Sequence, residues 1–354
     1  MTESDAWRAA AEAALKHYDC VHVRLARVPQ GLINLTVRVT ASNGRRYALQ
    51  RLHPVFGDAV NRNLARVTAH LRARGMLTPE LVPTATGAPD VVLPDGRWRL
   101  LTWIDGRAFD ALRTPAQARA AGQLLGRFHA ALADFTGEIE RDRPPVHDLE
   151  RHLANLAQAI AAHPHHRLAD NVAALAAEVE AAVTALGPLP VMRPRLVHGD
   201  PKISNVLFDA DGRDALCLID LDTLARMPVV LELGDALRSW CNPGAEDAPT
   251  ARIDLERMAA AMAGYETGAP GLLDAVERGA VVAATLAIHV ELAARFLADA
   301  LDERYFGWDS ARYPGRGEHN LARARGQLRA AASLREQRVA AEAIVAARGT
   351  TTAA

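Results

Sequence analysis

The stretch LVHGDPKISNVLFDADGRDALCLIDLD, residues 196–222, decides the fold. Apolar runs on either side of the turn signal Asp211-Gly212 predict a β-hairpin. Charged side chains seldom lie in such apolar surroundings for packing alone, so the stretch predicts a functional site. The polar side chains that interrupt the apolar frame are His198, Asp200, Lys202, Asn205, Asp220 and Asp222.

The two ends of the predicted hairpin bring oxygen atoms together. Asn205 begins the first strand and Asp220 ends the second, and the ends of a hairpin lie side by side. An amide carbonyl and a carboxylate are hard oxygen donors of the kind that Mg²⁺ prefers. We therefore predict that Asn205 and Asp220 are metal ligands.

The spacing from Asp200 to Asn205 matches the Asp-x-x-x-x-Asn pattern of a kinase catalytic loop. In phosphoryl transfer such an aspartate accepts the proton of the attacking hydroxyl, and we predict this role for Asp200. Lys202 lies two residues later and is predicted to neutralise the γ-phosphate during transfer. His198 is expected to orient the loop through backbone hydrogen bonds. Each residue alone fits a cap or a turn, but the compound pattern favours a kinase.

Composition bounds the function. The chain has 354 residues, of which 49% are hydrophobic and 23% charged, as in ordinary globular proteins. A formal net charge of -1 provides no basic field for nucleic acid or an anionic membrane, so neither partner is expected. The most apolar run, from residue 279, is interrupted by His289, Glu291 and Arg295, which favours a buried helix over a membrane span.

Two further features favour a cytoplasmic protein. The three cysteines are far apart, which argues against a disulfide framework, and the N-terminus lacks the pattern of a signal peptide. The oligomeric state is left open.

The hydrophobic pattern changes along the chain. Residues 21–28, 35–42, 45–52, 89–94 and 97–104 are strand-like and separated by turn signals, and residues 59–74 form the one helix expected among them. From residue 115 the pattern is mostly helical. The sequence therefore predicts an α+β fold with a sheet-rich N-lobe, residues 1–103, and a mainly helical C-lobe, residues 104–354. ATP and Mg²⁺ are expected between the lobes.

The connector WIDGRAFD, residues 103–110, follows an apolar strand. Trp103 and Ile104 could offer backbone groups to adenine, although an ordinary strand-to-helix loop also fits this segment.

The motifs His198-Gly199-Asp200 with Asn205, and Ile219-Asp220-Leu221-Asp222, resemble those of the aminoglycoside phosphotransferase and choline kinase superfamily. This resemblance implies a two-lobed protein-kinase-like fold and a small-molecule kinase that uses ATP and Mg²⁺. Within the superfamily, the chain is most similar to the N-acetylhexosamine 1-kinase type. The carrying segments are GLIN (31–34), YALQRLHPVF (47–56), IDLDT (219–223), LGDALRS (233–239) and ELAARFLADAL (291–301) with the residues up to 325.

The resemblance also implies roles for residues outside the hairpin. Gly31 lies in the loop over the phosphates, and Trp103 and Ile104 form the adenine-binding connector. Arg295 and Tyr305 match positions that contact the sugar. We place the following residues on the substrate side of the site: Asp222, Asp235, Arg238, Arg295 and Tyr305.

The chain departs from the family pattern at two places. The lysine that grips the phosphates in protein kinases is missing, and its register is occupied by Gln50 and Arg51, which strand alternation places on opposite faces. Leu32 and Leu35 replace a histidine and an aspartate that are usual in the sugar kinases.

The acceptor therefore stays open. The anomeric hydroxyl of an N-acetylhexosamine or a related hexose comes first, and an aminoglycoside, choline, ethanolamine or homoserine is the alternative. A nucleotide-binding module without catalysis is disfavoured, because Asp200, Asn205 and Asp220 are intact. Glu291 and Arg295, four residues apart, fit either an intrahelical ion pair or burial beside the substrate.

Overall fold

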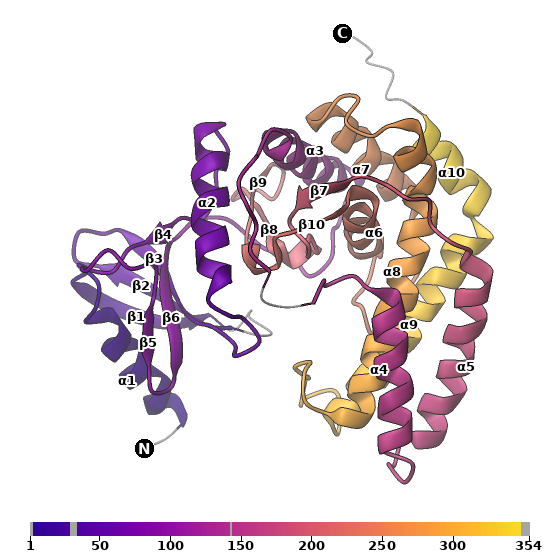
Figure 1. The fold of residues 1–354 in the computed structure, drawn as a ribbon, viewed down its shortest axis with the longest axis horizontal. Helices are drawn as coiled ribbons and strands as arrows, with labels where there is room; N and C mark the ends of the chain where they lie inside the picture. The colour runs from indigo at the N-terminus through magenta and orange to yellow at the C-terminus, as the bar shows by residue number, and fades with distance from the viewer. Residues whose placement is uncertain (1–2, 29–33, 142–143, 348–354) are drawn as a thin grey trace. The chain divides into compact units, whose positions relative to one another are not determined.

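The computed structural model describes residues 3–28, 34–141 and 144–347. The chain divides into two compact units (Figure 1). The first comprises Met1–Asp105 and Phe135–Pro144, and the second comprises Gly106–Asp134 and Pro145–Ala354. The segment Phe135–Pro144 thus returns to the first unit after the chain has entered the second, which the sequence did not predict.

The first unit is built on an antiparallel sheet. Its described strands follow the order β1-β2-β3-β6-β4, and β5 pairs with β6. The five strands predicted from the sequence are confirmed, and the two-residue β4 is an addition. The strands are β1 (His22–Val28), β2 (Leu35–Ala41), β3 (Arg46–Arg51), β4 (Leu81–Val82), β5 (Val91–Leu93) and β6 (Gly96–Thr102).

The two faces of this sheet have different chemistry. Helix α1 (Glu3–Leu15), which the sequence did not predict for this lobe, packs its alanines against Leu49, Trp98 and other apolar side chains of one face. The predicted helix is α2 (Ala59–Ala73), and it meets the opposite face through Asn61, which accepts a hydrogen bond from Arg99 of β6. Because side chains alternate along a strand, the two faces are drawn from alternate residues.

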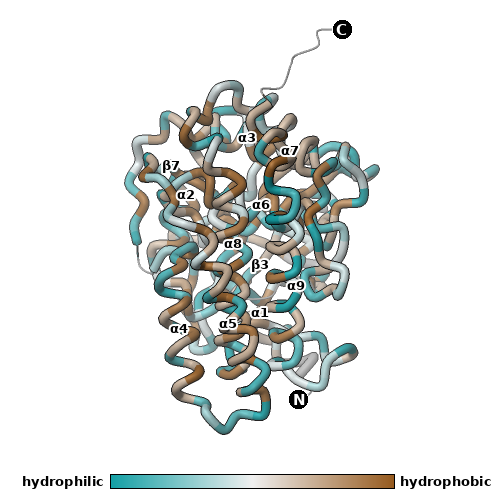
Figure 2. The backbone as a smooth tube through the Cα atoms, turned by 90° about the vertical axis from the view of Figure 1, so that its right-hand side faces the viewer, coloured by the Kyte–Doolittle hydropathy of each residue, from teal (hydrophilic) through white to brown (hydrophobic). Residues whose placement is uncertain are grey.

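The second unit is mainly helical (Figure 1). Figure 2 shows that α4 and α5 carry both hydrophobic and hydrophilic residues, as expected of helices with one buried side. Its described helices are α3 (Pro115–Leu132), α4 (Leu149–Ala162), α5 (Ala169–Leu186), α6 (Val229–Trp240), α7 (Leu255–Gly268), α8 (Ala275–Asp302), α9 (Arg316–Glu336) and α10 (Arg338–Ala346).

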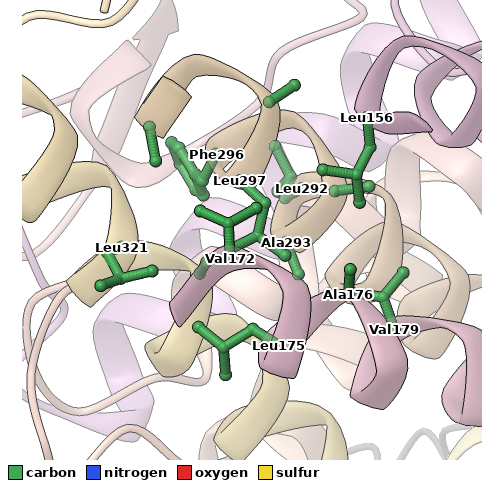
Figure 3. Close-up of a cluster of buried hydrophobic side chains, with 14 of the residues drawn as sticks. Leu156, Val172, Leu175, Ala176, Val179, Leu292, Ala293, Phe296, Leu297 and Leu321 are labelled. Atoms are coloured by element: carbon green, nitrogen blue, oxygen red, sulfur yellow. The ribbon is translucent and has the colours of Figure 1, made fainter. Parts of the chain in front are cut away.

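Helix α8 forms the core of this unit. It begins with a capping box between Asp274 and Glu277 and packs against α4, α5, α6 and α9. Figure 3 shows its side chains Leu292 and Phe296 among apolar residues from the neighbouring helices. By length and composition α8 is the one described helix that could cross a membrane, but 89% of its most apolar window is buried within the protein. The prediction of a buried helix is confirmed.

Two small sheets carry the stretch 196–222. The predicted hairpin is confirmed and consists of β8 (Val206–Phe208) and β9 (Ala215–Leu218). The strand that leads into it, β7 (Pro194–Val197), pairs with β10 (Ala225–Pro228), a pairing that the sequence did not predict. As a result, the start of the loop after β7 lies beside the end of the segment between β9 and β10. Both α+β character and the division into a sheet-rich and a helical part agree with the predicted fold class.

Candidate active site

The loop after β7 is fixed through its backbone. Glu232 of α6 is fully buried and accepts hydrogen bonds from the His198 backbone N–H at 3.0 Å and from the Gly199 N–H at 2.6 Å. Gly199 has a φ of +88°, and a Cβ there would collide with the carbonyl oxygen of Thr223. The turn before Asp200 therefore needs glycine for its conformation and for its close approach to the neighbouring segment.

His198 orients the loop, as the sequence predicted. Its Nε2 donates to the carbonyl oxygen of Ile219 at 2.9 Å, and its Nδ1 accepts from the Asp200 N–H at 3.3 Å. Thr223 donates its hydroxyl to the His198 carbonyl at 2.8 Å. The side chain of His198 thus connects the loop before Asp200 to the end of the hairpin just before Asp220.

A chain of buried hydrogen bonds connects Glu232 to two other helices. His129 of α3 donates Nε2–H to Glu232 at 2.8 Å, and Tyr265 of α7 lies 2.8 Å from its Nδ1. Because a carboxylate only accepts, Nε2 carries the proton and Nδ1 accepts from the tyrosine hydroxyl. Burial would raise the pKa of Glu232, but the hydrogen bond from His129 and the nearby donors outweigh it and lower this pKa. Glu232 is therefore ionised and can hold all three donors.

Asp200, Lys202 and Asn205 converge. Lys202 Nζ forms an ion pair with Asp200 Oδ2, and Asn205 donates Nδ2 to the backbone oxygen of Asp200 at 2.8 Å and to Oδ2 at 3.2 Å. Burial would raise the pKa of Asp200, but the charge of Lys202, its hydrogen bond and the other nearby cations together outweigh burial and lower this pKa. The carboxylate is therefore ionised near neutral pH, which suits a proton acceptor.

Asp220 lies beside this group. The Ile219 N–H donates to the Asn205 carbonyl oxygen at 2.9 Å, so the two hairpin ends meet as predicted. Asp220 adopts a left-handed conformation with φ 64° and ψ 51°, a costly backbone for a residue other than glycine and one that clusters at functional sites. Burial would lower the pKa of Lys202, but Asp200 and then Asp220 outweigh it and raise this pKa. Lys202 is thus within electrostatic reach of both carboxylates.

The donor set at the hairpin ends fits a divalent cation. Asn205 uses Nδ2 toward Asp200, which leaves its Oδ1 as the ligand atom, and Asp220 contributes a carboxylate. In the described ranges there is no group of three or more His, Cys, Asp or Glu side chains that could hold a metal. Two protein oxygens completed by phosphate and water oxygens are the usual coordination of Mg²⁺ in nucleotide-dependent enzymes, so the residues present fit this ion.

The predicted substrate-side residues lie on α6 and α8 and beyond. Asp235 is buried and accepts from Arg238 Nε at 2.8 Å, while Arg238 Nη1 donates to Glu246 at 2.9 Å. Burial raises the pKa of Asp200 and the charge of Lys202 lowers it; the charge of Arg238 lowers it further, by a smaller amount. The ion pair Asp235–Arg238 therefore lies near the loop of Asp200. Asp222 is also buried, in the short helical turn 221–223.

Arg295 and Tyr305 meet at a third residue. Arg295 lies over the ring of Phe306 at 5.7 Å, and Tyr305 contacts the same ring edge-on at 4.8 Å. Of the two alternatives for Glu291 and Arg295, an ion pair between them is not formed among the described residues. Glu291 instead accepts from His147 at 3.0 Å. Burial would raise the pKa of Glu291, but this bond and the nearby positive charges together outweigh burial and lower this pKa.

The candidate nucleotide residues of the first unit separate by face. Gln50 accepts from Arg99 Nε at 2.9 Å and from Nη2 at 2.7 Å, and it lies on the face of α2. Arg51 stacks over Trp98 on the other face, which α1 covers, and bonds to Asp95 at 3.2 Å. Strand alternation is thus observed, and Gln50 rather than Arg51 shares a face with the buried guanidinium of Arg99.

The connector shows which backbone groups are in use. The Trp103 N–H donates to the Arg46 carbonyl at 3.2 Å and so extends the sheet ladder, and its indole N–H bonds to Asp105 at 3.1 Å. The ladder ends there, so Ile104 is the first residue of the connector beyond it. Gly31, predicted to cover the phosphates, lies outside the described residues.

A family model for the phosphotransferase enzyme family matches residues 24–270. The chain belongs to the phosphotransferase enzyme family. The match spans the sheet of the first unit and, in the second, the loop of Asp200, the hairpin and α6. Every element that brings Asp200, Asn205 and Asp220 together lies inside it.

Relatives of this phosphotransferase are small-molecule kinases. It is 29% identical over 223 residues to a homoserine kinase of Hyphomonas neptunium, a match that covers 61% of this chain and 64%, just under two thirds, of the relative. Its fold is shared with the amicoumacin kinase hAmiN in complex with AMP-PNP, Ca²⁺ and Ami (TM-score 0.62, 15% identity, 93% of each chain). It is also shared with a choline/ethanolamine kinase family protein of Mesorhizobium loti (TM-score 0.56, 19% identity, 97% and 99% of the chains).

The candidate site of this phosphotransferase contains residues that sequence reasoning missed. Glu232, His129 and Tyr265 are far apart in the chain, and only a charged residue inside the apolar run VVLELGDAL signals the first of them. The close crossing of α3 and α7 brings the other two together, because a Cβ at Gly122 or Gly264 would collide with the backbone of the facing helix. These small residues let the helices approach closely enough for His129 to reach Tyr265.

Proposed function

We propose that this protein transfers the γ-phosphoryl group of ATP to a hydroxyl of a small amino alcohol. The observation that carries the proposal is the convergence of Asp200, Lys202 and Asn205 at the hairpin end that also bears Asp220. Asp200 accepts the proton of the acceptor hydroxyl, the oxygen forms a bond to the γ-phosphorus, and the bond to the β-phosphate oxygen breaks to release ADP. Lys202 neutralises charge on the transferred group.

Asn205 and Asp220 would hold Mg²⁺. When bound, the ion neutralises phosphate charge and orients the phosphates. The residues of the chain do the remaining work: Glu232 and His198 fix the backbone of the loop, and Asn205 holds the carboxylate of Asp200 in place. A site preorganised in this way needs little rearrangement in the transition state.

The first unit, residues 1–103 in the sequence prediction, would bind the nucleotide. Ile104 would offer its backbone to adenine, because the Trp103 N–H is already used by the sheet. Gln50, and the Arg99 guanidinium that it positions, would take the place of the missing lysine near the phosphates. A cytoplasmic location and ATP as the nucleotide are parts of the same proposal.

The acceptor is proposed from the relatives and from the departures in sequence. Homoserine kinase activity in a relative that is 29% identical supports an amino alcohol. The replacement of the usual histidine and aspartate by Leu32 and Leu35 removes polar groups typical of the sugar kinases. A hexose stays the second candidate, because Arg295 and Tyr305, which match sugar-contacting positions, meet at Phe306.

An ADP-release screen tests the proposal. Wild-type protein with ATP and Mg²⁺ is assayed with L-homoserine, ethanolamine, 1-amino-2-propanol, N-acetylhexosamines and their 1-O-methyl glycosides. Release that depends on an amino alcohol supports the proposal. Release with the free hexoses but not with the methyl glycosides supports anomeric phosphorylation instead, and release with no acceptor in the panel contradicts both.

A further inference from the structure

The segment that follows Asp200 is anchored to the C-terminal end of α6. The buried indole of Trp240 donates Nε1–H to the carbonyl oxygen of Pro201 at 2.9 Å, and the hydroxyl oxygen of Ser239 accepts the N–H of Ile203 at 3.0 Å. The first turn of the same helix already holds the segment before Asp200. One helix therefore holds the loop on both sides of this carboxylate.

These two bonds fix the peptide units on either side of Lys202. Because each peptide unit is planar, the backbone at a residue has only two soft rotations, φ and ψ. Trp240 holds the peptide between residues 201 and 202 through its carbonyl oxygen. Ser239 holds the peptide between residues 202 and 203 through its N–H, and the Asn205 N–H donates to the carbonyl oxygen of that same peptide at 2.9 Å. The direction in which the Lys202 side chain leaves the backbone is thus fixed.

A lysine depends on such support more than an arginine does. Its ammonium is a compact charge on a flexible stem and lacks the planar fork that orients a guanidinium. The chain has 41 lysine and arginine residues, and only Lys16 and Lys202 are lysines. Lys202 forms an ion pair with Asp200, and the charge of Asp220 also acts on it. A shift of the backbone at Lys202 would therefore move the ammonium away from both carboxylates.

We propose that Trp240 and Ser239 are positioning residues for Lys202, and that their hydrogen bonds keep its ammonium where the γ-phosphoryl group is transferred. The inference rests on the proposed function and names two residues on which that site depends. Both side chains act through the backbone of the loop. Removing either bond should displace Lys202 without removing any group that contacts ATP or the acceptor.

The first test does not need turnover. A lysine-specific endoproteinase can cut the full chain only after Lys16 and after Lys202, and cleavage after Lys202 requires the loop to open. Trp240→Phe, which removes the indole N–H but keeps an aromatic ring, and Ser239→Ala should each speed this cleavage about fivefold, the factor that one hydrogen bond contributes to local opening. Cleavage after Lys16 serves as the internal reference. An unchanged rate after Lys202 in both variants overturns the inference.

Two further variants control for a general loss of stability. Trp98→Phe removes an indole N–H that bonds to Asp95 at 3.1 Å, and Ser333→Ala removes a hydroxyl that accepts the Ile253 N–H at 3.3 Å. Each control loses the same kind of bond as its counterpart, outside the segments that hold the loop. The controls should leave cleavage after Lys202 close to the wild-type rate. Equal acceleration in the controls and the test variants would assign the effect to global unfolding and overturn the inference.

The second test is a double-mutant cycle on ADP release, measured with the acceptor that the wild type uses best. In the wild-type background, Trp240→Phe should lower kcat about tenfold while KM for ATP and for the acceptor changes much less, because a displaced group slows transfer without weakening binding. In a Lys202→Met background the same change should have little further effect, since the group that it positions is already gone. A further loss of kcat as large as that in the wild-type background overturns the inference.

The outcomes separate this inference from the kinase proposal. Unchanged kcat in both Trp240→Phe and Ser239→Ala overturns the positioning role, while acceptor-dependent ADP release by the wild type leaves the kinase proposal standing. Absence of such release in the wild type overturns the kinase proposal. The cleavage assay then still decides whether Trp240 and Ser239 hold the backbone at Lys202.

Discussion

Replacing Glu232 by glutamine should weaken the hydrogen bonds that hold the backbone of the catalytic loop. In the native protein, Oε1 accepts from the His198 N–H and from His129, and Oε2 accepts from the Gly199 N–H. The amide group of Glu232→Gln must occupy one of these positions and face a donor. At the Oε2 position it leaves the Gly199 N–H unpaired. At the Oε1 position it leaves the His198 N–H unpaired, because His129 can carry its proton on Nδ1 and donate it to the Tyr265 hydroxyl.

The magnitude follows from this count. One unmet buried donor costs about 1–3 kcal/mol, and the remaining bonds lose the strength that the charge gave them. We therefore expect the free energy of unfolding to fall by about 2–4 kcal/mol. The same change should lower kcat, because the backbone at Gly199 sets the position of Asp200, whereas direct contacts to substrate are untouched.

Urea denaturation at pH 7 measures the first effect, and ADP release measures the second. Glu178→Gln on the exposed side of α5 is the matched control and should change stability by less than about 0.5 kcal/mol. If Glu232→Gln unfolds within that same range of the wild type, the three hydrogen bonds do not hold the loop, and the reasoning is refuted.

Three further predictions concern the same loop and the buried His289. Gly199→Ala should cost about 2 kcal/mol or more in urea denaturation, because strain at φ +88° adds to the collision with Thr223, whereas Gly187→Ala, with φ +67° and open space, should cost about 1 kcal/mol; equal losses would contradict the collision. Thr223→Val should lower the free energy of unfolding by about 1 kcal/mol, because it loses the hydrogen bond to the His198 carbonyl. An unchanged free energy of unfolding would mean that this bond does not stabilise the fold. Between pH 6.5 and about 4, His289 binds a proton in the unfolded chain but not in the folded one. The free energy of unfolding should therefore decrease as the pH is lowered across this window, by about 3 kcal/mol at most. His289→Gln should flatten that slope in denaturation curves, and an unchanged slope would assign it to other groups.

The hairpin and its ends could be predicted because the signals are local. A turn at Asp211-Gly212 between apolar runs fixes which residues are opposite, and this alone places Asn205 beside Ile219 and Asp220. The kinase pattern then follows from spacing. The fold class likewise follows from the change of hydrophobic period along the chain, and family membership agrees with it.

Long-range contacts could not be predicted in the same way. Strand alternation separates Gln50 from Arg51, but only the packing of α1 shows which face is covered by apolar side chains. In the sequence, Glu232 is one charged residue of an amphipathic helix. Its role is visible only in the structure, which brings His129 and the loop after β7 within hydrogen-bond distance. The position of the proton on His289 depends on the direction of the Gln327 amide, and that direction is set by Glu246 from a different segment.

The most direct test of the account is the rate of Asp200→Asn. The variant keeps the shape of the side chain but removes the base, while Asn205, Asp220 and the loop scaffold stay in place. With the acceptor that the wild type uses best, kcat for ADP release should fall by about 10³-fold, within the usual range for loss of a general base, while the fold remains native by circular dichroism. Phosphoryl transfer by a folded Asp200→Asn protein at the wild-type rate would contradict the central claim.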